Sequence, residues 1–249
     1  MYFDKYLAAN LIGGFIKIAD LKMGTLKIIS NSGEAFSGRI EAGQLLSQQL
    51  QDYRSQKAAV LGIPRGGVII ARQIANELEA DLDIVLSHKL GAPGNPELAI
   101  GAVCEDGKLF IDEKISSYVG ADENYIKQER VRQLKEITRR VELYRKVLAR
   151  LSLKSRIVIV TDDGVATGAT MQAALWAVRQ EKPQKIIAAL PVGSQDSLQN
   201  LAEDADETIC LQAPLYFAAL SQFYSHFTQV DDEELLEILA AESKRRNKE

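Results

Sequence analysis

The stretch IVIVTDDGVATGAT occupies residues 157–170. It begins with a run of β-branched residues, which is typical of a strand buried on both faces of a parallel sheet. Two adjacent acids, Asp162 and Asp163, follow where this strand should end. Neighbouring carboxylates raise each other's pKa, so an unliganded pair is electrostatically unfavourable. We therefore expect these two side chains to serve a ligand.

The residues after the two acids are small and rich in hydroxyl groups. They are Gly164 and Val165, followed by Ala166, Thr167, Gly168, Ala169 and Thr170. Small side chains let backbone N–H groups close around an anion, and the helix expected next begins with its positive dipole end. Ligands of open parallel sheets bind at the carboxyl ends of strands. A phosphate on this loop and a diol on the carboxylates together describe a ribose 5-phosphate.

Other phosphate motifs fit this stretch less well. A P-loop needs a lysine that the loop does not have, and the dinucleotide fingerprint GxGxxG is absent from it. An aspartyl-phosphate hydrolase would need acids one residue apart rather than adjacent. An ordinary strand-to-helix turn with acidic capping residues is the structural alternative, and it leaves the combination of paired acids and small-residue loop unexplained.

The rest of the chain predicts one α/β domain. Short apolar runs alternate with helical patterns, which is typical of parallel βαβ units. We expect residues 1–35 to form an N-terminal arm and residues 36–249 a single domain, with a helical excursion at about 112–152 and a hood at about 212–249. The expected strands are at residues 58–63, 82–86, 156–161, 185–190 and 208–211, and a hairpin turn is expected around residues 105–107.

Composition excludes several functional classes. With a net charge of −4, the protein has no strong positive field that would attract nucleic acid. The two cysteines are widely separated in sequence, which indicates a reduced, cytoplasmic protein. Two histidines are too few for a histidine-rich metal site. The apolar segment near the N-terminus is too short to span a bilayer, so we expect no membrane partner.

Residues 157–170 resemble the phosphoribosyl-pyrophosphate (PRPP) motif of the type I phosphoribosyltransferases. Two further stretches, VLGIPRGGVIIARQIANEL and HKLGAPGNPELAIGAV, are similar to an uncharacterised branch of that family. The resemblance implies a central parallel sheet flanked by helices, with a C-terminal hood. It also implies transfer of ribose 5-phosphate from PRPP to a nitrogenous base, with release of pyrophosphate and with Mg²⁺ as cofactor.

The resemblance assigns roles residue by residue. Asp162 and Asp163 would hold the ribose hydroxyls and contact Mg²⁺, directly or through water, and residues 166–170 would hold the 5-phosphate. Arg65, Gly66 and Gly67 would bind pyrophosphate, and a cis peptide is expected at Arg65–Gly66. Lys89, on a Gly/Pro-rich lid, would reach the same group. The implied catalytic residues are Lys89, Arg65 and Asp163.

The chain departs from the family pattern at two positions. His88 stands where an arginine is common, which weakens a functional role for His88 but not for Lys89. Ala166 stands where 6-oxopurine enzymes carry an acid, so purine salvage is in doubt and the acceptor base is unidentified. Glu97 could orient the lid, meet Mg²⁺ or be an ordinary solvated charge.

Two features leave alternatives open. Aromatic residues such as Phe217 and Tyr224 could stack a base or simply pack the C-terminal segment. The basic helix at residues 122–151 could contact a partner or nucleic acid, but such runs are more often solvated faces. A non-catalytic sensor of PRPP or a nucleotide is therefore the alternative to an enzyme, and a homodimer is left open.

Overall fold

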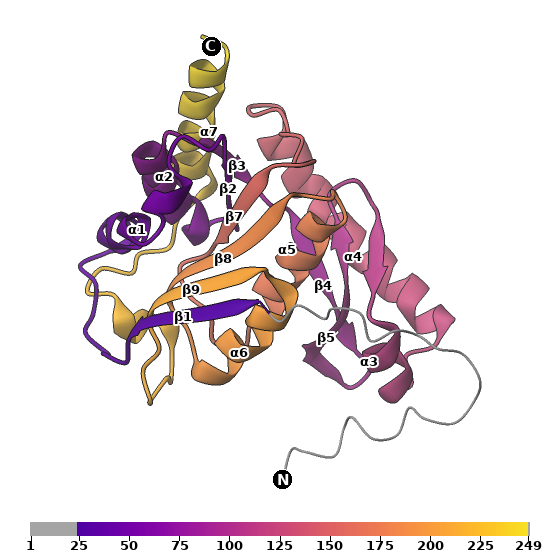
Figure 1. Cartoon of the computed structure of the whole chain (residues 1–249). Coiled ribbons are helices and arrows are strands. Elements are labelled where there is room, and N and C mark those ends of the chain that lie inside the picture. Colours follow the sequence, from indigo (N-terminus) through magenta and orange to yellow (C-terminus); the bar gives the residue numbers. More distant parts are fainter. Residues whose placement is uncertain (1–23, 249) are drawn as a thin grey trace.

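A six-stranded parallel sheet forms the centre of the computed structural model, which describes residues 24–248 (Figure 1). The strand order is β1-β9-β8-β7-β2-β3, and every neighbouring pair is parallel. The strands are β1 Thr25–Ser30, β2 Ala59–Gly62, β3 Asp81–Ile84, β7 Ile157–Thr161, β8 Lys185–Val192 and β9 Glu207–Gln212.

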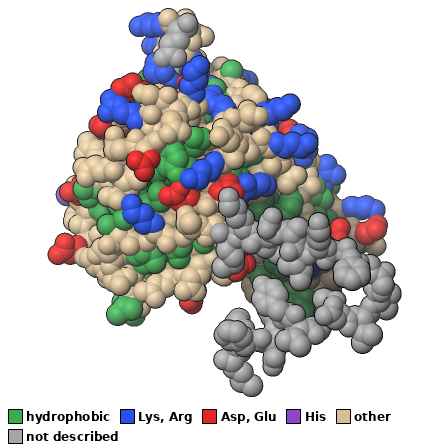
Figure 2. Space-filling view, viewed as in Figure 1, with side chains coloured by type: hydrophobic (Ala, Val, Ile, Leu, Met, Phe, Trp, Pro, Cys, Tyr) green, Lys and Arg blue, Asp and Glu red, His purple; other side chains and the backbone are tan. Residues whose placement is uncertain are grey.

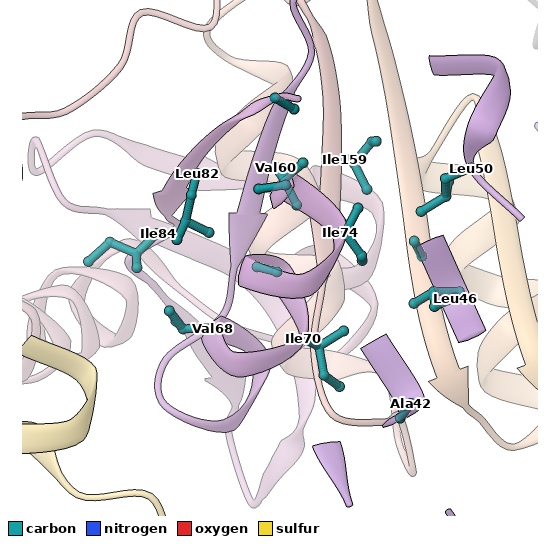
Figure 3. Packing of buried hydrophobic residues seen from close by; sticks show 14 of the residues in the cluster. Ala42, Leu46, Leu50, Val60, Val68, Ile70, Ile74, Leu82, Ile84 and Ile159 are labelled. Carbon is teal, nitrogen blue, oxygen red and sulfur yellow. The ribbon is translucent and has the colours of Figure 1, made fainter. Parts of the chain in front are cut away.

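Helices cover both faces of this sheet. On one face lie α1 Arg39–Gln48, α2 Gly66–Leu78 and α7 Asp232–Arg246, and on the other lie α5 Ala169–Arg179 and α6 Gln195–Asp204. Alternation along the strands creates the two cores: Val60 and Ile159 face α1 and α2, whereas Leu61 faces α5. Figure 3 shows the first core, where side chains from these helices interdigitate with those of the strands.

A smaller antiparallel sheet lies beside the main one. It has the order β4-β5-β6, with β4 Ser87–Ala92, β5 Asn95–Cys104 and β6 Leu109–Ile111. The short helix α3 Glu113–Tyr118 and the long helix α4 Glu123–Tyr144 pack against it (Figure 1). The turn expected around residues 105–107 therefore connects two strands, β5 and β6, as predicted.

The structure corrects three sequence-based expectations. The Gly/Pro-rich segment after Lys89 is not an irregular loop but the hairpin of β4 and β5, because its strands pair from Ser87 with Cys104 onward. The long helix ends at Tyr144 rather than near residue 151. Strand β1 was not expected, yet it pairs with β9 at the sheet edge. It lies within the predicted arm, whose residues 1–23 are outside the described part.

A buried ion pair joins α4 to the central sheet. The carboxylate of Asp83, 1% exposed, accepts a hydrogen bond of 2.6 Å from Arg145 Nη1. It also accepts backbone N–H bonds from Leu151 and from Ile84. Arg145 binds Glu105 as well, with Nε 2.8 Å from Oε2. Because both charged groups are shielded from water, removal of either one would leave the other as an uncompensated charge inside the protein.

We predict that Arg145→Ala lowers the free energy of unfolding by about 3–5 kcal/mol, because it leaves a buried carboxylate without its cation. Urea unfolding followed by circular dichroism measures this loss. Arg139→Ala is the control, since Arg139 is exposed on the same helix and has no hydrogen bond or ion pair among the described residues. Its effect should stay within about 0.5 kcal/mol. A loss below ~1 kcal/mol for Arg145→Ala would contradict the role of the pair.

Candidate functional site

Two loops meet at the carboxyl ends of the adjacent strands β7 and β2. Asp162 and Asp163 follow β7, and the segment Pro64 to Gly67 follows β2. A Cβ on Gly66 would lie 2.1 Å from Asp163 Oδ2, and one on Gly67 would lie 2.8 Å from the Asp162 Cα. Only glycine permits this approach. The structure therefore brings together the two motifs that the sequence placed in one site.

The backbone of the second loop contains a cis peptide bond, but not at the expected position. The bond is Pro64–Arg65 rather than Arg65–Gly66. Arg65 lies at the start of α2, with its guanidinium 3.6 Å from the Asp232 carboxylate at the start of α7. The same carboxylate accepts a 2.6 Å hydrogen bond from Tyr144 Oη, so α4, α7 and the Arg65 loop meet at one point.

Asp163 is held from two directions. Its Oδ2 lies 2.9 Å from Arg39 Nε and 2.8 Å from Arg39 Nη2, and its backbone carbonyl accepts a 2.6 Å hydrogen bond from Tyr224 Oη. The Arg39 guanidinium is 4.1 Å from the centroid of the Phe227 ring. Sequence reasoning missed Arg39, because a lone arginine at a helix start carries no motif. The hydrogen bonds from Arg39 and Tyr224 therefore fix the orientation of Asp163 in the folded protein.

Asp162 is the electrostatically costly member of the pair. Burial raises the pKa of its carboxyl group well above the usual range, and the negative charge of Asp163 raises it further. Its Oδ1 accepts a 2.8 Å hydrogen bond from the backbone N–H of Asp163, which favours the charged form. A cation or hydroxyl groups brought to this carboxylate would offset the remaining cost.

The loop after the two acids leaves its backbone donors free. Within the described structure, the N–H groups of residues 166–170 have no acceptor in the backbone or in side chains. The Ala166 carbonyl is turned toward α6, where it accepts hydrogen bonds of 2.8 Å from Ser194 Oγ and 2.7 Å from Ser197 Oγ. Gly168 has φ +82°, a left-handed conformation that favours glycine. Five free donors at a helix start are arranged as in loops that bind anions, and we refer to residues 166–170 as the anion-binding loop in that predicted sense.

Lys89 and His88 lie on β4 rather than at the end of β3. Lys89 Nζ is 3.0 Å from Glu97 Oε2, across the hairpin. Lys89 lines a cavity of about 290 Å³ together with Pro64 from the β2 loop and Thr170 from the anion-binding loop. Lys89 therefore lies at the same cavity as residues of both predicted phosphate-binding loops. Glu97 lies beside Lys89 and forms an ion pair with it.

The aromatic segment mostly packs the C-terminal residues onto the domain. Tyr224 is 5% exposed, with its ring 5.6 Å from that of Phe36 and 5.0 Å from that of Phe227. Its buried ring therefore packs the C-terminal segment, one of the two alternatives that the sequence left open, and its hydroxyl donates to the Asp163 carbonyl. Phe217 is partly buried against Phe223, with ring centroids 4.9 Å apart. Phe227 lines a cavity of about 410 Å³ beside the two acids.

The acid pair fits a hydrated divalent cation better than a fully protein-bound metal. Among residues 24–248, no group of three or more His, Cys, Asp or Glu side chains could hold a metal ion. Mg²⁺ keeps several waters and commonly takes one or two carboxylates besides substrate phosphate oxygens. Asp162 and Asp163 supply that number.

Among residues 24–248, we also find no helix with the length and apolarity needed to cross a membrane.

Comparison with known proteins identifies the family. The model of the phosphoribosyl transferase domain matches residues 37–224. The chain belongs to the phosphoribosyltransferase family. This confirms the family suggested by residues 157–170, and the match includes both loops of the site.

Two relatives and one solved structure support the assignment. Two proteins of Mycobacterium tuberculosis, from strains CDC 1551 and H37Rv, are both named "Putative phosphoribosyl transferase". Each is 39% identical over 204 residues, which are 82% of this chain and 46% of the relative, so the chain spans about half their length. The crystal structure of TT1426 from Thermus thermophilus is 42% identical, with a TM-score of 0.80 over 84% of this chain and 99% of that one. The predicted phosphoribosyltransferase-like α/β fold is thereby confirmed.

We predict that Asp162→Asn stabilises this phosphoribosyltransferase-family protein at neutral pH. The folded-state pKa of Asp162 is raised, so the folded chain holds this proton more tightly than the unfolded chain, and stability falls as pH rises between the two pKa values. Asparagine removes this penalty. We expect the Tm to rise by about 2–4 °C at pH 7.5, the shift that ~1 kcal/mol produces in a domain of this size.

The advantage should shrink as the pH is lowered toward the ordinary range of aspartate, because the wild-type carboxyl group is then protonated in both states. Calorimetry across this pH range measures it. Asp52→Asn, which changes an exposed carboxylate, should leave the Tm within about 1 °C. An Asp162→Asn protein less stable than wild type at neutral pH would contradict the assigned electrostatic cost.

Proposed function

We propose that this protein transfers ribose 5-phosphate from PRPP to a nitrogen nucleophile and releases pyrophosphate. The observation that carries the proposal is the set of five free N–H groups at residues 166–170 directly beside two carboxylates. Ribose 5-phosphate carries both a phosphate group for the N–H groups and a vicinal diol for the carboxylates. Family membership supports the reaction class, and the chemistry of the loops supports the substrate.

Each part of the site has a role in the proposed reaction. The 5-phosphate binds the N–H groups of residues 166–170, and the ribose hydroxyls bind Asp162 and Asp163. Arg65 and the backbone of Gly66 and Gly67 contact pyrophosphate. Mg²⁺, when bound, would supply positive charge to the phosphate oxygens, and the two carboxylates would hold it directly or through water.

In the reaction, the bond from C1 of the ribose to the pyrophosphate oxygen breaks, and a bond from C1 to the acceptor nitrogen forms. The leaving group takes the bonding electron pair, and the acceptor nitrogen loses its proton. Negative charge grows on pyrophosphate, so fixed cations near it stabilise the transition state more than the ground state. Ala166 cannot accept the proton, since it carries no acid, and we therefore propose an acceptor other than a 6-oxopurine.

The alternative is a protein that senses PRPP or a nucleotide without catalysis. The basic helix was its main support, but several of those charges are used inside the protein: Arg130 donates to the Gly107 carbonyl, Arg132 pairs with Glu129, and Arg145 pairs with Asp83. This use weakens the case for a basic partner-binding surface. We also propose a cytoplasmic location, which the two free, buried cysteines support.

The deciding experiment is a pyrophosphate-release assay with PRPP, Mg²⁺ and a panel of purines, pyrimidines and small amines. Catalysis is supported if one acceptor gives release that the double variant Asp162→Asn, Asp163→Asn abolishes. Tight PRPP binding without release for any acceptor would favour the sensor. No binding of PRPP or ribose 5-phosphate by the wild-type protein would overturn both.

We predict that Lys89→Ala lowers kcat and kcat/KM together, once an acceptor is known. In the structure Lys89 is held by Glu97, so its contact with the leaving group would form mainly in the reacting state. The expected loss is about 2–4 kcal/mol of transition-state stabilisation, as for removal of an oxyanion-hole donor. Steady-state kinetics measures it, with Lys146→Ala as the control because Lys146 is exposed outside the site. An effect on KM alone, or an equal effect of the control, would count against this role.

A further inference from the structure

A cavity separates the long helix α4 from the two predicted phosphate-binding loops. It has a volume of about 290 Å³ and lies between β4 and α4. Ile63 and Pro64 line it from the β2 loop, and Thr170 lines it from the anion-binding loop. The cavity therefore adjoins the loop predicted to hold pyrophosphate and the loop predicted to hold the 5-phosphate. The wall that α4 contributes decides what a ligand in this cavity can be.

One stripe of α4 faces the cavity. It consists of Glu129, Gln133, Ile137 and Arg140, together with the neighbouring Arg132. These positions repeat with the period of the helix, so they share one face. Figure 2 shows Lys and Arg side chains along the right-hand edge, where Figure 1 places α4. Most of this charge is exposed, whereas Arg140 is half-buried at the cavity.

Arg140 is the cation on this stripe that the fold leaves without a partner. Arg132 Nη2 lies 2.7 Å from Glu129 Oε1, so these two charges cancel. Among the described residues, Arg140 has no ion pair or hydrogen bond. A half-buried guanidinium without an anion is unfavourable unless a ligand supplies one. Arg140 thus points to an anionic group in the cavity.

His88 adds a polar wall but no charge at neutral pH. Burial lowers its pKa, and the positive charge of Arg140 contributes in the same direction. Gln133 Nε2 donates to Glu129 Oε1 over 2.8 Å, which leaves Gln133 Oε1 to accept from His88 Nδ1 over 3.0 Å. This hydrogen bond places a proton on Nδ1 of the imidazole. Lys89 also lines the cavity, but its charge is paired with Glu97 over 3.0 Å, so the unpaired positive charge among the described lining residues is that of Arg140.

We propose that Arg140 binds the pyrophosphate group of the substrate, which makes α4 a wall of the site. This rests on the proposed function. The cavity also has an apolar floor, including Val85 and Leu86, and such a floor strengthens a charge-assisted contact by excluding water. Arg140 and Lys89 line the cavity from α4 and β4. The diphosphate thus meets cations from two segments that are distant in sequence, next to Pro64 of the β2 loop.

The test measures two ligands separately by calorimetric titration of the full chain: inorganic pyrophosphate and ribose 5-phosphate. The variants are Arg140→Ala, Arg140→Lys and the control Arg139→Ala. We expect Arg140→Ala to weaken pyrophosphate binding by about ten- to a hundredfold, as for loss of a hydrogen bond to a charged group. Ribose 5-phosphate binding should change less than about twofold, and Arg140→Lys should recover part of the loss through its charge.

The outcomes separate this inference from the proposed function. Wild-type protein that binds both ligands, with pyrophosphate affinity unchanged in Arg140→Ala, would overturn the role of Arg140 and leave the function standing. Equal weakening of both ligands, or an equal effect of Arg139→Ala, would also overturn it, since the effect would then be general. Wild-type protein that binds neither ligand would overturn the proposed function itself. Thermal unfolding of each variant verifies that the compared proteins are folded.

Discussion

The contact between the loops after β7 and β2 is the constraint on which the site depends. The backbone at Gly66 and Gly67 lies so close to Asp162 and Asp163 that a methyl group at either glycine would overlap them. The parallel pairing of β2 with β7 sets this distance, because both loops leave the sheet at the same level. The acids and the arginine loop therefore occupy positions fixed by the central sheet rather than by flexible segments.

The electrostatics of the site follow from that contact. Two carboxylates are forced into proximity, and the fold stabilises them unequally: Arg39 neutralises Asp163, while Asp162 keeps a raised pKa. Functional sites often retain such unfavourable groups because a ligand offsets the cost when it binds. Arg140 and the free N–H groups of residues 166–170 have the opposite need, because among the described residues they lack an anion or a hydrogen-bond acceptor. An anion would satisfy both, and a cation or hydroxyl groups would satisfy Asp162.

The central sheet and the two loops could be predicted from sequence because local patterns encode them. Apolar runs indicate buried parallel strands, and paired acids with a small-residue loop mark the end of such a strand, so residues 157–170 contained both signals. Arg39 and Arg140 could not be found this way. Each reaches the site from a helix distant in sequence, and only the packing of α1 and α4 determines where its guanidinium lies. The hairpin of β4 and β5 was missed for a related reason: its Gly and Pro residues suggest a loop, but cross-strand pairing overrides that local preference.

Helix α7 has a further consequence for the order in which the site is assembled. Asp232, at its start, contacts Arg65, and Glu242, near its end, accepts the backbone N–H of Leu82 on β3 over 3.1 Å. During synthesis on the ribosome, the strands and both candidate ligand loops emerge before these residues. The Arg65 loop and the edge strand β3 therefore gain these two contacts only after α7 has emerged. A nascent chain can form the sheet earlier, but Arg65 pairs with Asp232 only once α7 has packed onto the domain.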